Sequence, residues 1–283
     1  MKLVRVGPAG MERPAVLTDD GRLLDLSSVA SDIDGALLAT GVDRVRAALD
    51  AGTLPALAEQ DPRYGPPLAR PGKIVCIGLN YRDHAAETQA EPPSEPVVFL
   101  KTPATIVGPD DVVLIPRGST KTDYEVELGV VIGRTARYLD SDDEALACVA
   151  GYVLSHDVSE REFQLERGGT WDKGKNCETF NPLGPWLLTA DEVADPQALG
   201  LRLWVNGAAR QQGSTKEMIF PVAEIVRYLS QFMVLEPGDL INTGTPAGVA
   251  LGRAEPKPYL REGDVVELEI DGLGRQRQVM GRA

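Results

Sequence analysis

The chain has 283 residues, of which 43% are hydrophobic and 25% charged, and its formal net charge is −13. This composition is that of a globular protein with a core large enough to fold without disulfides. The acidic balance argues against a nucleic-acid partner, because binding a polyanion requires a basic face. It also argues against an anionic membrane surface, and no apolar run has the length of a transmembrane helix.

The cysteines indicate the compartment. Cys76, Cys148 and Cys177 are odd in number and widely spaced, and no C-x-x-C occurs. This pattern argues against a disulfide framework or a zinc site and favours a reducing cytoplasm. The first residues lack an apolar segment of the signal-peptide type, so we expect a cytoplasmic protein.

Residues 1–68 are expected to form a small N-terminal β/α domain. The Asp19-Asp20-Gly21 turn between two apolar runs predicts a hairpin, and apolar residues at helical spacing from 42 to 49 predict a helix. The proline-rich stretch 60–67 is the best linker candidate. The main domain is therefore predicted to cover 69–283.

Strand patterns recur through the main domain, whereas helices are few. The expected strands cover 73–78, 97–100, 112–115, 125–132, 186–189, 201–205, 240–242 and 265–270. A capping box at Ser141–Glu144 predicts a short helix ending near Gly151, and an amphipathic stripe from Val222 to Met233 predicts another. Because strands and helices do not alternate, we predict an α+β, β-rich fold rather than a doubly wound one.

The first candidate site lies in the apolar strand expected at 125–132. Glu125 and Glu127 are two residues apart, so they project to one face with about 6.6 Å of backbone between them. Two carboxylates in an apolar setting repel each other, and a hard cation with oxygen ligands relieves this repulsion. An edge strand with its acidic face in water is the alternative.

A second apolar strand ends at His156 and Asp157, where a third carboxylate could project. Asp157 could equally cap the following helix by accepting a hydrogen bond from the Glu160 N–H. Three carboxylates suit Mg²⁺, Mn²⁺ or Ca²⁺ rather than zinc. We interpret His156 as a hydrogen-bonded structural residue, not as a ligand.

His84 and Glu87 lie three residues apart on a helical turn expected near Asp83, so they share a face. A carboxylate beside imidazole raises its basicity, which makes a general base for water. A surface pair of little consequence is the alternative. The following Glu91–Pro96 stretch is typical of a lid.

Further candidates could contact a substrate. Lys175, expected in a loop between strands, could reach an anionic substrate or a developing oxyanion, or it could be an ordinary solvated lysine. The loop containing Gly244 and Thr245 offers backbone N–H groups and a hydroxyl to a carboxylate, although it could also be a plain turn. Lys101 ends a strand, and Gln164 follows the second acidic segment.

Together these segments resemble the fumarylacetoacetate hydrolase family, from about Lys73 to Val279. The motifs that carry the resemblance are, in chain order, G-L-N-Y-R-D-H-A-A-E, F-L-K-T-P, D-Y-E-V-E-L-G-V-V-I-G, H-D-V-S-E-R-E-F-Q, G-K-N-C-E-T-F-N-P-L-G-P and L-E-P-G-D-L-I-N-T-G-T-P-A-G-V. Two positions depart from the family pattern: Glu178 replaces a common Asp, and Lys216-Glu217 replaces S/T-D. The second departure bears on the substrate tail.

The resemblance implies a mixed β-sheet roll, usually in a homodimer. It implies a divalent cation, Mg²⁺ with Mn²⁺ or Ca²⁺ as alternatives, held by Glu125, Glu127 and Asp157. The implied catalytic residues are His84, Glu87, Lys175 and Gln164. The implied substrate contacts are Thr245, Gly244, Lys101 and Tyr81.

The implied activity is catabolic hydrolysis of the C–C bond of a small 2,4-dioxo acid of the acylpyruvate type, which releases pyruvate or a related 2-oxo acid. The N-terminal extension resembles most the branch that acts on sugar-derived acids such as 2,4-didehydro-3-deoxy-rhamnonate. A 2-oxo-diacid decarboxylase and a 2-hydroxyhepta-2,4-diene-1,7-dioate-type isomerase would use the same metal site. A metal- or ligand-binding protein without turnover is the remaining alternative.

Overall fold

The computed structural model describes residues 1–58, 61–87 and 91–283. Its strands are β1 (Lys2–Val6), β2 (Arg13–Leu17), β3 (Leu23–Asp25), β4 (Tyr64–Gly65), β5 (Ile74–Gly78), β6 (Val97–Lys101), β7 (Ile106–Val107), β8 (Val113–Ile115), β9 (Thr122–Asp123), β10 (Val126–Ile132), β11 (Val149–His156), β12 (Ser159–Glu160), β13 (Asn181–Pro182), β14 (Leu187–Thr189), β15 (Gly200–Val205), β16 (Ala208–Ser214), β17 (Leu240–Asn242), β18 (Val265–Ile270) and β19 (Gly274–Arg282).

The α-helices are α1 (Gly35–Thr40), α2 (Val42–Asp50), α3 (Arg82–Glu87), α4 (Asp142–Ala147), α5 (Arg161–Leu165), α6 (Asp172–Lys175) and α7 (Val222–Leu229). Short 3₁₀ turns cover Pro103–Thr105, Ala190–Glu192, Pro196–Ala198, Thr215–Glu217 and Ala250–Gly252. Within the described part of the chain, no helix combines the length and the apolar character that crossing a membrane requires.

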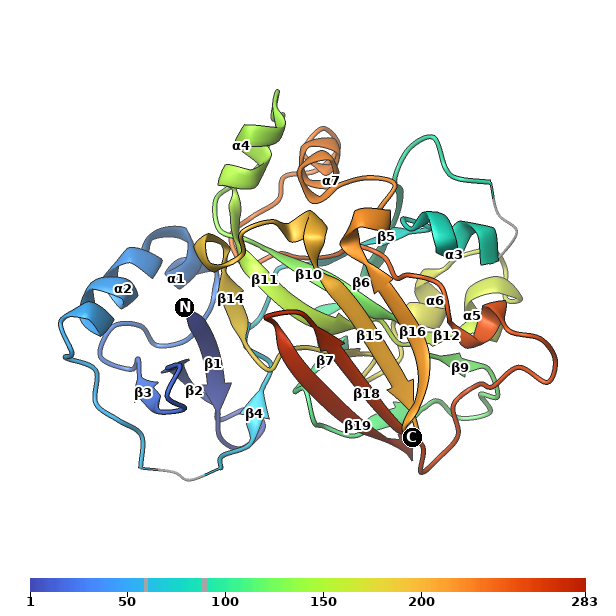
Figure 1. Ribbon diagram of the computed structural model, residues 1–283, viewed down its shortest axis with the longest axis horizontal. Coiled ribbons are helices and arrows are strands. Elements are labelled where there is room, and N and C mark those ends of the chain that lie inside the picture. Colours follow the sequence, from blue (N-terminus) through green and yellow to red (C-terminus); the bar gives the residue numbers. More distant parts are fainter. Residues whose placement is uncertain (59–60, 88–90) are drawn as a thin grey trace.

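Most strands form one long mixed sheet and a second sheet of five strands (Figure 1). The remaining strands pair as β9 with β12 and β7 with β13. The long sheet has the order β3-β2-β1-β14-β11-β10-β17-β5-β6, and β4 pairs with β1. The second sheet has the order β16-β15-β18-β19-β8. Most neighbours are antiparallel, but β17 pairs with β5 and β19 pairs with β8 in parallel. The β-rich fold of mixed sheets predicted from the sequence is confirmed.

The N-terminal strands extend the long sheet, because β1 pairs with both β2 and β14. Figure 1 shows these strands and helices α1 and α2 at one end of the molecule, and α3, α5 and α6 toward the other end. The predicted hairpin is present, with β2 and β3 flanking Asp19–Gly21. The proposed division near residue 68 stays a prediction, and Gln60 of the predicted linker lies outside the described residues.

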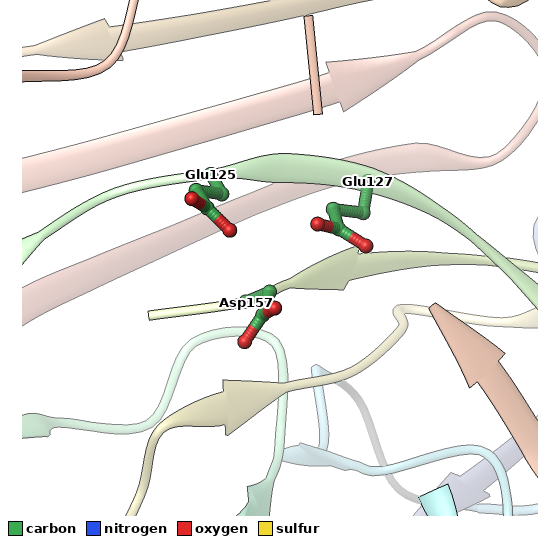
Figure 2. Close-up of side chains that lie close together, drawn as sticks. All are labelled: Glu125, Glu127 and Asp157. Atoms are coloured by element: carbon green, nitrogen blue, oxygen red, sulfur yellow. The ribbon is translucent and has the colours of Figure 1, made fainter. Parts of the chain in front are cut away.

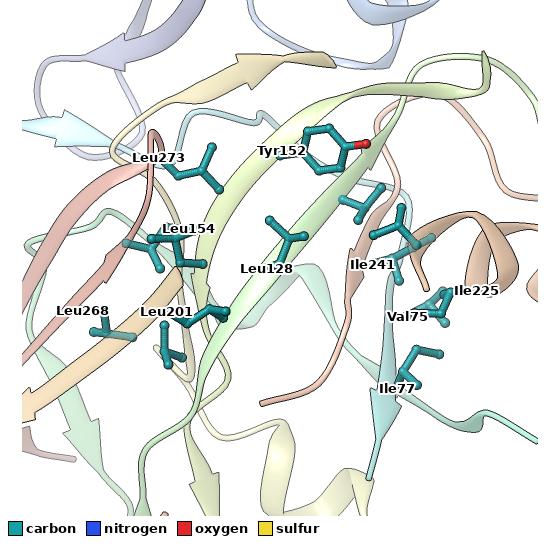
Figure 3. Packing of buried hydrophobic residues seen from close by; sticks show 14 of the residues in the cluster. Val75, Ile77, Leu128, Tyr152, Leu154, Leu201, Ile225, Ile241, Leu268 and Leu273 are labelled. Atoms are coloured by element: carbon teal, nitrogen blue, oxygen red, sulfur yellow. The ribbon is translucent and has the colours of Figure 1, made fainter. Parts of the chain in front are cut away.

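The main core lies between the two sheets (Figure 3). Leu128 of β10 and Leu154 of β11 belong to the same apolar cluster as Leu201 of β15 and Leu268 of β18. The opposite face of β10 is also covered, because Val131 belongs to a second apolar cluster. A strand buried on both faces reads as a continuous apolar run. The alternative of a solvated edge strand is therefore wrong, since β10 lies between β11 and β17.

Two helices end earlier than their sequence patterns predict. Helix α4 ends at Ala147 rather than near Gly151, because β11 already begins at Val149. Gly151 instead allows two strands to approach, since a Cβ added there would lie 2.2 Å from the carbonyl oxygen of Leu188. Helix α7 covers only the first part of its predicted stripe and ends at Leu229.

His156 ends β11 in a fully buried position, and its Nδ1 lies 3.0 Å from Oε1 of Gln278. The interpretation of His156 as a hydrogen-bonded structural residue is confirmed. Burial disfavours the charged imidazolium, so the pKa of His156 falls to about 4.

We predict that His156→Asn flattens the pH dependence of folding stability between about pH 4 and pH 6.5. The unfolded chain takes up a proton near the ordinary histidine pKa of 6.5, whereas the folded chain takes it up only near 4. Stability is therefore lost as the pH falls through this window. Urea unfolding of the parent protein and the variant at several pH values measures how the free energy of unfolding of each depends on pH. Equal slopes in the two proteins would contradict the low pKa of His156.

Candidate active site

The pairing of β10 with β11 brings three predicted acids together. The register aligns Val126 with His156, and the Asp157 N–H donates to the Glu125 carbonyl over 3.0 Å. Figure 2 shows the side chains of Glu125 and Glu127 projecting from one strand toward Asp157. One carboxylate oxygen from each lies within 4.8 Å of the others. The three acids named from the sequence therefore converge in space.

The alternative role of Asp157 as a helix cap is wrong. Glu160 caps α5 by accepting from the Phe163 N–H over 2.9 Å. Asp157 instead accepts from two ammonium groups, from Lys175 over 2.8 Å and from Lys101. The cap of α5 thus lies three residues later than expected, and the Asp157 side chain lies near the two glutamates instead.

Two cations hold Glu125. Lys175 Nζ donates to Glu125 Oε2 over 2.6 Å, and Arg161 Nη2 donates to Oε1 over 2.7 Å. Burial alone would raise the pKa of Glu125, but Lys175 and Arg161 lower it to about 2. This carboxylate is therefore charged at neutral pH even though it is buried.

Within the described part of the chain, no lysine or arginine forms an ion pair with Glu127. Its Oε2 accepts a 2.9 Å hydrogen bond from the Gly244 N–H. Burial and the nearby Asp157 and Glu125 carboxylates raise the pKa of Glu127 well above its ordinary value. A proton or a further cation would stabilise this site.

The charges of the buried ion-pair network around the three acids favour a divalent cation at this site. When Glu127 is ionised, as it would be to bind a cation, four carboxylates against three cations leave a net charge of −1: Asp123, Glu125, Glu127 and Asp157 against Lys101, Arg161 and Lys175. A divalent cation would make the network positive, which suits an anionic ligand. Carboxylate oxygens are the donors that Mg²⁺, Mn²⁺ and Ca²⁺ prefer, so the residues present fit a hard divalent cation.

A cavity of about 190 Å³ opens beside the acids. The predicted site residues that line it are His84, Glu125, Glu127, Gln164, Lys175, Gly244 and Thr245. Glu87 does not line the cavity but lies 3.6 Å from His84, which does. Asp157, Lys101 and Tyr81 are buried and do not line it.

Lys101 and Tyr81 lie behind the predicted site. Lys101 donates to Asp157 and, over 2.7 Å, to the Phe180 carbonyl, so it holds a candidate metal ligand in place. The Tyr81 hydroxyl is buried and has no hydrogen-bond partner among the described residues. Their contact with a substrate stays a prediction.

Lys175 and Gln164 come from two short helices. Lys175 is the last residue of α6, not part of an irregular loop, and the expectation of a solvated lysine is wrong because it is 2% exposed. Gln164 lies on α5, where its Oε1 accepts from Arg161 Nη1 over 2.9 Å. Both side chains line the cavity beside the acids.

The loop after β17 runs beside the acidic strand. The Thr245 hydroxyl donates to the Val126 carbonyl over 2.9 Å and accepts from Gln211 Nε2 over 2.8 Å. Gln211 Oε1 also accepts from the Val126 N–H over 3.0 Å. Gln211 therefore fixes both the loop and the residue between the two glutamates, so it is a positioning residue that the sequence reasoning missed.

Helix α3 holds the predicted dyad. His84 Nδ1 lies 3.6 Å from Glu87 Oε2, and the side chains are 9% and 17% exposed, so the alternative of a solvated surface pair is wrong. The Gly248 N–H donates to Glu87 over 2.8 Å. Burial raises the pKa of Glu87, but His84 and this N–H together lower it by more, so the pKa lies below the ordinary value. Glu87 is thus a charged partner for the imidazole.

Arg161 and Asp123 are the other residues that were missed. Arg161 Nε donates to Asp123 over 2.9 Å, and Asp123 accepts from the N–H groups of Ala250 and Leu251 over 2.8 and 3.0 Å. Through Arg161 and Asp123, these bonds connect Glu125 with the loop whose Gly248 N–H donates to Glu87. A sequence does not show which charges are buried, although the need of buried acids for cations could have directed attention to Arg161.

Comparison with known proteins agrees with this fold and site. The family described as Fumarylacetoacetate (FAA) hydrolase C-terminal matches residues 73–280. A curated relative from Burkholderia multivorans, provisionally named a hydrolase, is 53% identical over 99% of this chain and 98% of its own length. The mixed-sheet fold and its buried acids thus define a class of hydrolases and isomerases, and the chain belongs to the fumarylacetoacetate hydrolase family.

Two solved structures are similar over 100% of this chain. One, from Mycobacterium abscessus and provisionally described as a 2-hydroxyhepta-2,4-diene-1,7-dioate isomerase, is 35% identical with a TM-score of 0.83 over 99% of its chain. The other, maleylpyruvate hydrolase from Sphingobium sp. SYK-6 in complex with manganese(II) and pyruvate, is 28% identical with a TM-score of 0.81 over 100% of its chain.

We predict that Asp157→Asn weakens Mn²⁺ binding by at least about 100-fold. Changes around a metal ligand alone cost roughly 10- to 100-fold in affinity, and this change removes a charged oxygen ligand itself. Isothermal calorimetry with Mn²⁺ measures the effect. The matched control is Asp239→Asn, a buried carboxylate outside the cluster. Unchanged Mn²⁺ affinity in the Asp157 variant would refute the ligand assignment.

Proposed function

We propose that this protein is a metal-dependent hydrolase that cleaves the C–C bond of a 2,4-dioxo acid of the acylpyruvate type. One observation carries the proposal: Glu125, Glu127 and His84 line the same cavity. Asp157 lies within 4.8 Å of the two glutamates, and Glu87 lies 3.6 Å from His84. The maleylpyruvate hydrolase with bound manganese and pyruvate supports it, because that relative's fold matches this chain throughout.

Glu125, Glu127 and Asp157 would hold the divalent cation. When bound, the ion would supply Lewis-acid polarisation of the oxygens of a 2-oxo acid. The manganese in the relative supports a divalent ion, and Mg²⁺ is our proposal for this chain.

His84 is the proposed general base. It removes a proton from water, whose oxygen attacks the 4-carbonyl of the substrate. The C3–C4 bond then breaks, its electron pair stays on C3, and C3 takes up a proton. One water is consumed, and the products are a carboxylic acid and pyruvate. Glu87 stabilises the imidazolium that forms, because it lies 3.6 Å from Nδ1 and is charged.

Lys175 and Gln164 are the proposed partners of the developing oxyanion. Burial would lower the pKa of Lys175, but the adjacent Asp157 and Glu125 raise it, so this ammonium stays charged. A permanently charged donor that is itself buried, as Lys175 is, stabilises negative charge strongly. Lys175 is therefore suited to electrostatic stabilisation and not to proton removal.

A second candidate is isomerisation, and the similar structure from Mycobacterium abscessus favours it. Keto–enol isomerisation requires only proton transfers, which the same dyad would perform. Incubation with acetylpyruvate separates the two activities, since only a hydrolase releases acetate. Incubation with oxaloacetate and assay of CO₂ tests the decarboxylase alternative.

We predict that His84→Gln lowers the rate of acetylpyruvate hydrolysis by roughly 100- to 10,000-fold, the usual contribution of a general base. Its Mn²⁺ affinity should stay within about twofold of the parent value, because His84 is not part of the acidic cluster. Acetate release and calorimetry give the two readouts. Full turnover by the variant would remove the general-base role.

We also propose that the enzyme acts in the cytoplasm as a homodimer. The three free cysteines support a reducing compartment.

A further inference from the structure

We infer that the substrate is a monocarboxylic 2-oxo acid whose far end is an uncharged, apolar tail that contacts Leu79, Leu165 and Trp171. This inference rests on the proposed function, because it assumes that the acidic end of the cavity receives the 2-oxo acid. It concerns the opposite end of the substrate, which the proposed chemistry does not define.

The cavity wall has two chemical parts. The polar part contains Glu125 and Glu127, which are 5% and 2% exposed. The other part is apolar and consists of Ile77, Leu79, Phe99, Leu165, Trp171 and Leu251. Leu165 is 46% exposed, so the apolar part reaches the opening of the cavity. A substrate anchored at the buried acids must pass this surface on its way to solvent.

The backbone is adapted to form this apolar surface. Leu79 has a φ of +52°, a left-handed conformation that a leucine rarely adopts and that persists mainly at functional positions. Next to it, a Cβ added to Gly78 would lie 2.3 Å from the Trp171 ring, so only glycine lets the indole pack there. The Trp171 ring also meets Phe99 edge to face at 5.6 Å. The indole is thus held firmly at the wall.

The charges around the cavity disfavour a second carboxylate. Arg161 and Lys175 are the cationic residues that line its described wall, and both already donate to buried acids. The charged Glu87 beside His84 adds a further negative charge near the cavity. Among the described residues that line the cavity, a carboxylate at the tail would therefore find no lysine or arginine that is not already paired with a buried acid.

The same wall disfavours a sugar-derived tail. Hydroxyl groups against leucine and tryptophan side chains would lose hydrogen bonds to water without replacement. An alkyl or aryl tail would instead bury apolar surface. This chain would then differ from a relative that acts on a 1,7-dioate, whose substrate carries a carboxylate at each end.

The test compares the binding of three 2-oxo acids to the full-length protein in Mn²⁺ buffer by calorimetry. Pyruvate has no tail, 2-oxohexanoate has an alkyl tail, and 2-oxoadipate has the same length with a terminal carboxylate. We expect 2-oxohexanoate to bind at least about tenfold more tightly than either of the others, because each buried methylene adds a few-fold in affinity. Equal or tighter binding of 2-oxoadipate, or no binding of 2-oxohexanoate, would overturn the inference.

Substitution of Leu165 tests whether the apolar part of the cavity wall causes the preference for 2-oxohexanoate. Leu165→Ala should weaken 2-oxohexanoate binding about fivefold and leave pyruvate binding unchanged, and Leu165→Arg should shift the preference toward 2-oxoadipate. Leu165 is exposed, so neither change should prevent folding. The control is Leu146→Ala, a leucine of α4 with 40% exposure that does not line the cavity. Equal effects of Leu165→Ala on all three acids would contradict the assignment.

The outcome separates this inference from the proposed function. If acetylpyruvate is hydrolysed but the alkyl tail gives no advantage in binding, the hydrolase stands and the tail site is wrong. If the alkyl tail is preferred but no acylpyruvate is cleaved, the tail site stands and the hydrolase is wrong.

Discussion

The burial of several carboxylates at one point of the sheet is the constraint that organises this protein. Buried acids repel each other and lose their hydration, so each needs a cation or a proton. Lys101, Arg161 and Lys175 meet this need for Asp157 and Glu125, whereas Glu127 forms no ion pair with any of the residues that the structure describes. The positions of α5, α6 and the end of β6 follow from this requirement, because these elements carry the three cations.

Much of the fold could be predicted because its strands have distinct sequence patterns. The apolar run of β10 shows a strand buried on both faces. Glu127 stands out within this run, and Glu125 stands out directly before it. Asn206-Gly207 and Asp271-Gly272, residue pairs typical of tight hairpin turns, join β15 to β16 and β18 to β19. Helix ends were less predictable, since the length of α4 depends on where β11 begins pairing with its neighbours.

The candidate site was predictable where chemistry is concentrated in short motifs and unpredictable where it depends on partners far along the chain. Glu125, Glu127 and Asp157 converge as expected. The roles of Arg161 and Gln211 depend on contacts over 36 and 85 residues, which no local pattern encodes. The same limit applies to Asp157, whose partners among the lysines, not its local sequence, decide that it does not cap α5.

The guanidinium of Arg161 has a consequence for how the two halves of the site adjust to each other. The guanidinium donates hydrogen bonds to both Glu125 and Asp123, and Asp123 accepts from the backbone of the 250–251 turn. Glu87 accepts from the Gly248 N–H of the same loop. If the Glu125 carboxylate shifts when it binds a metal ion, the shift would therefore be transmitted to the loop that holds Glu87. Ion loading and alignment of the base would then behave as a single cooperative event.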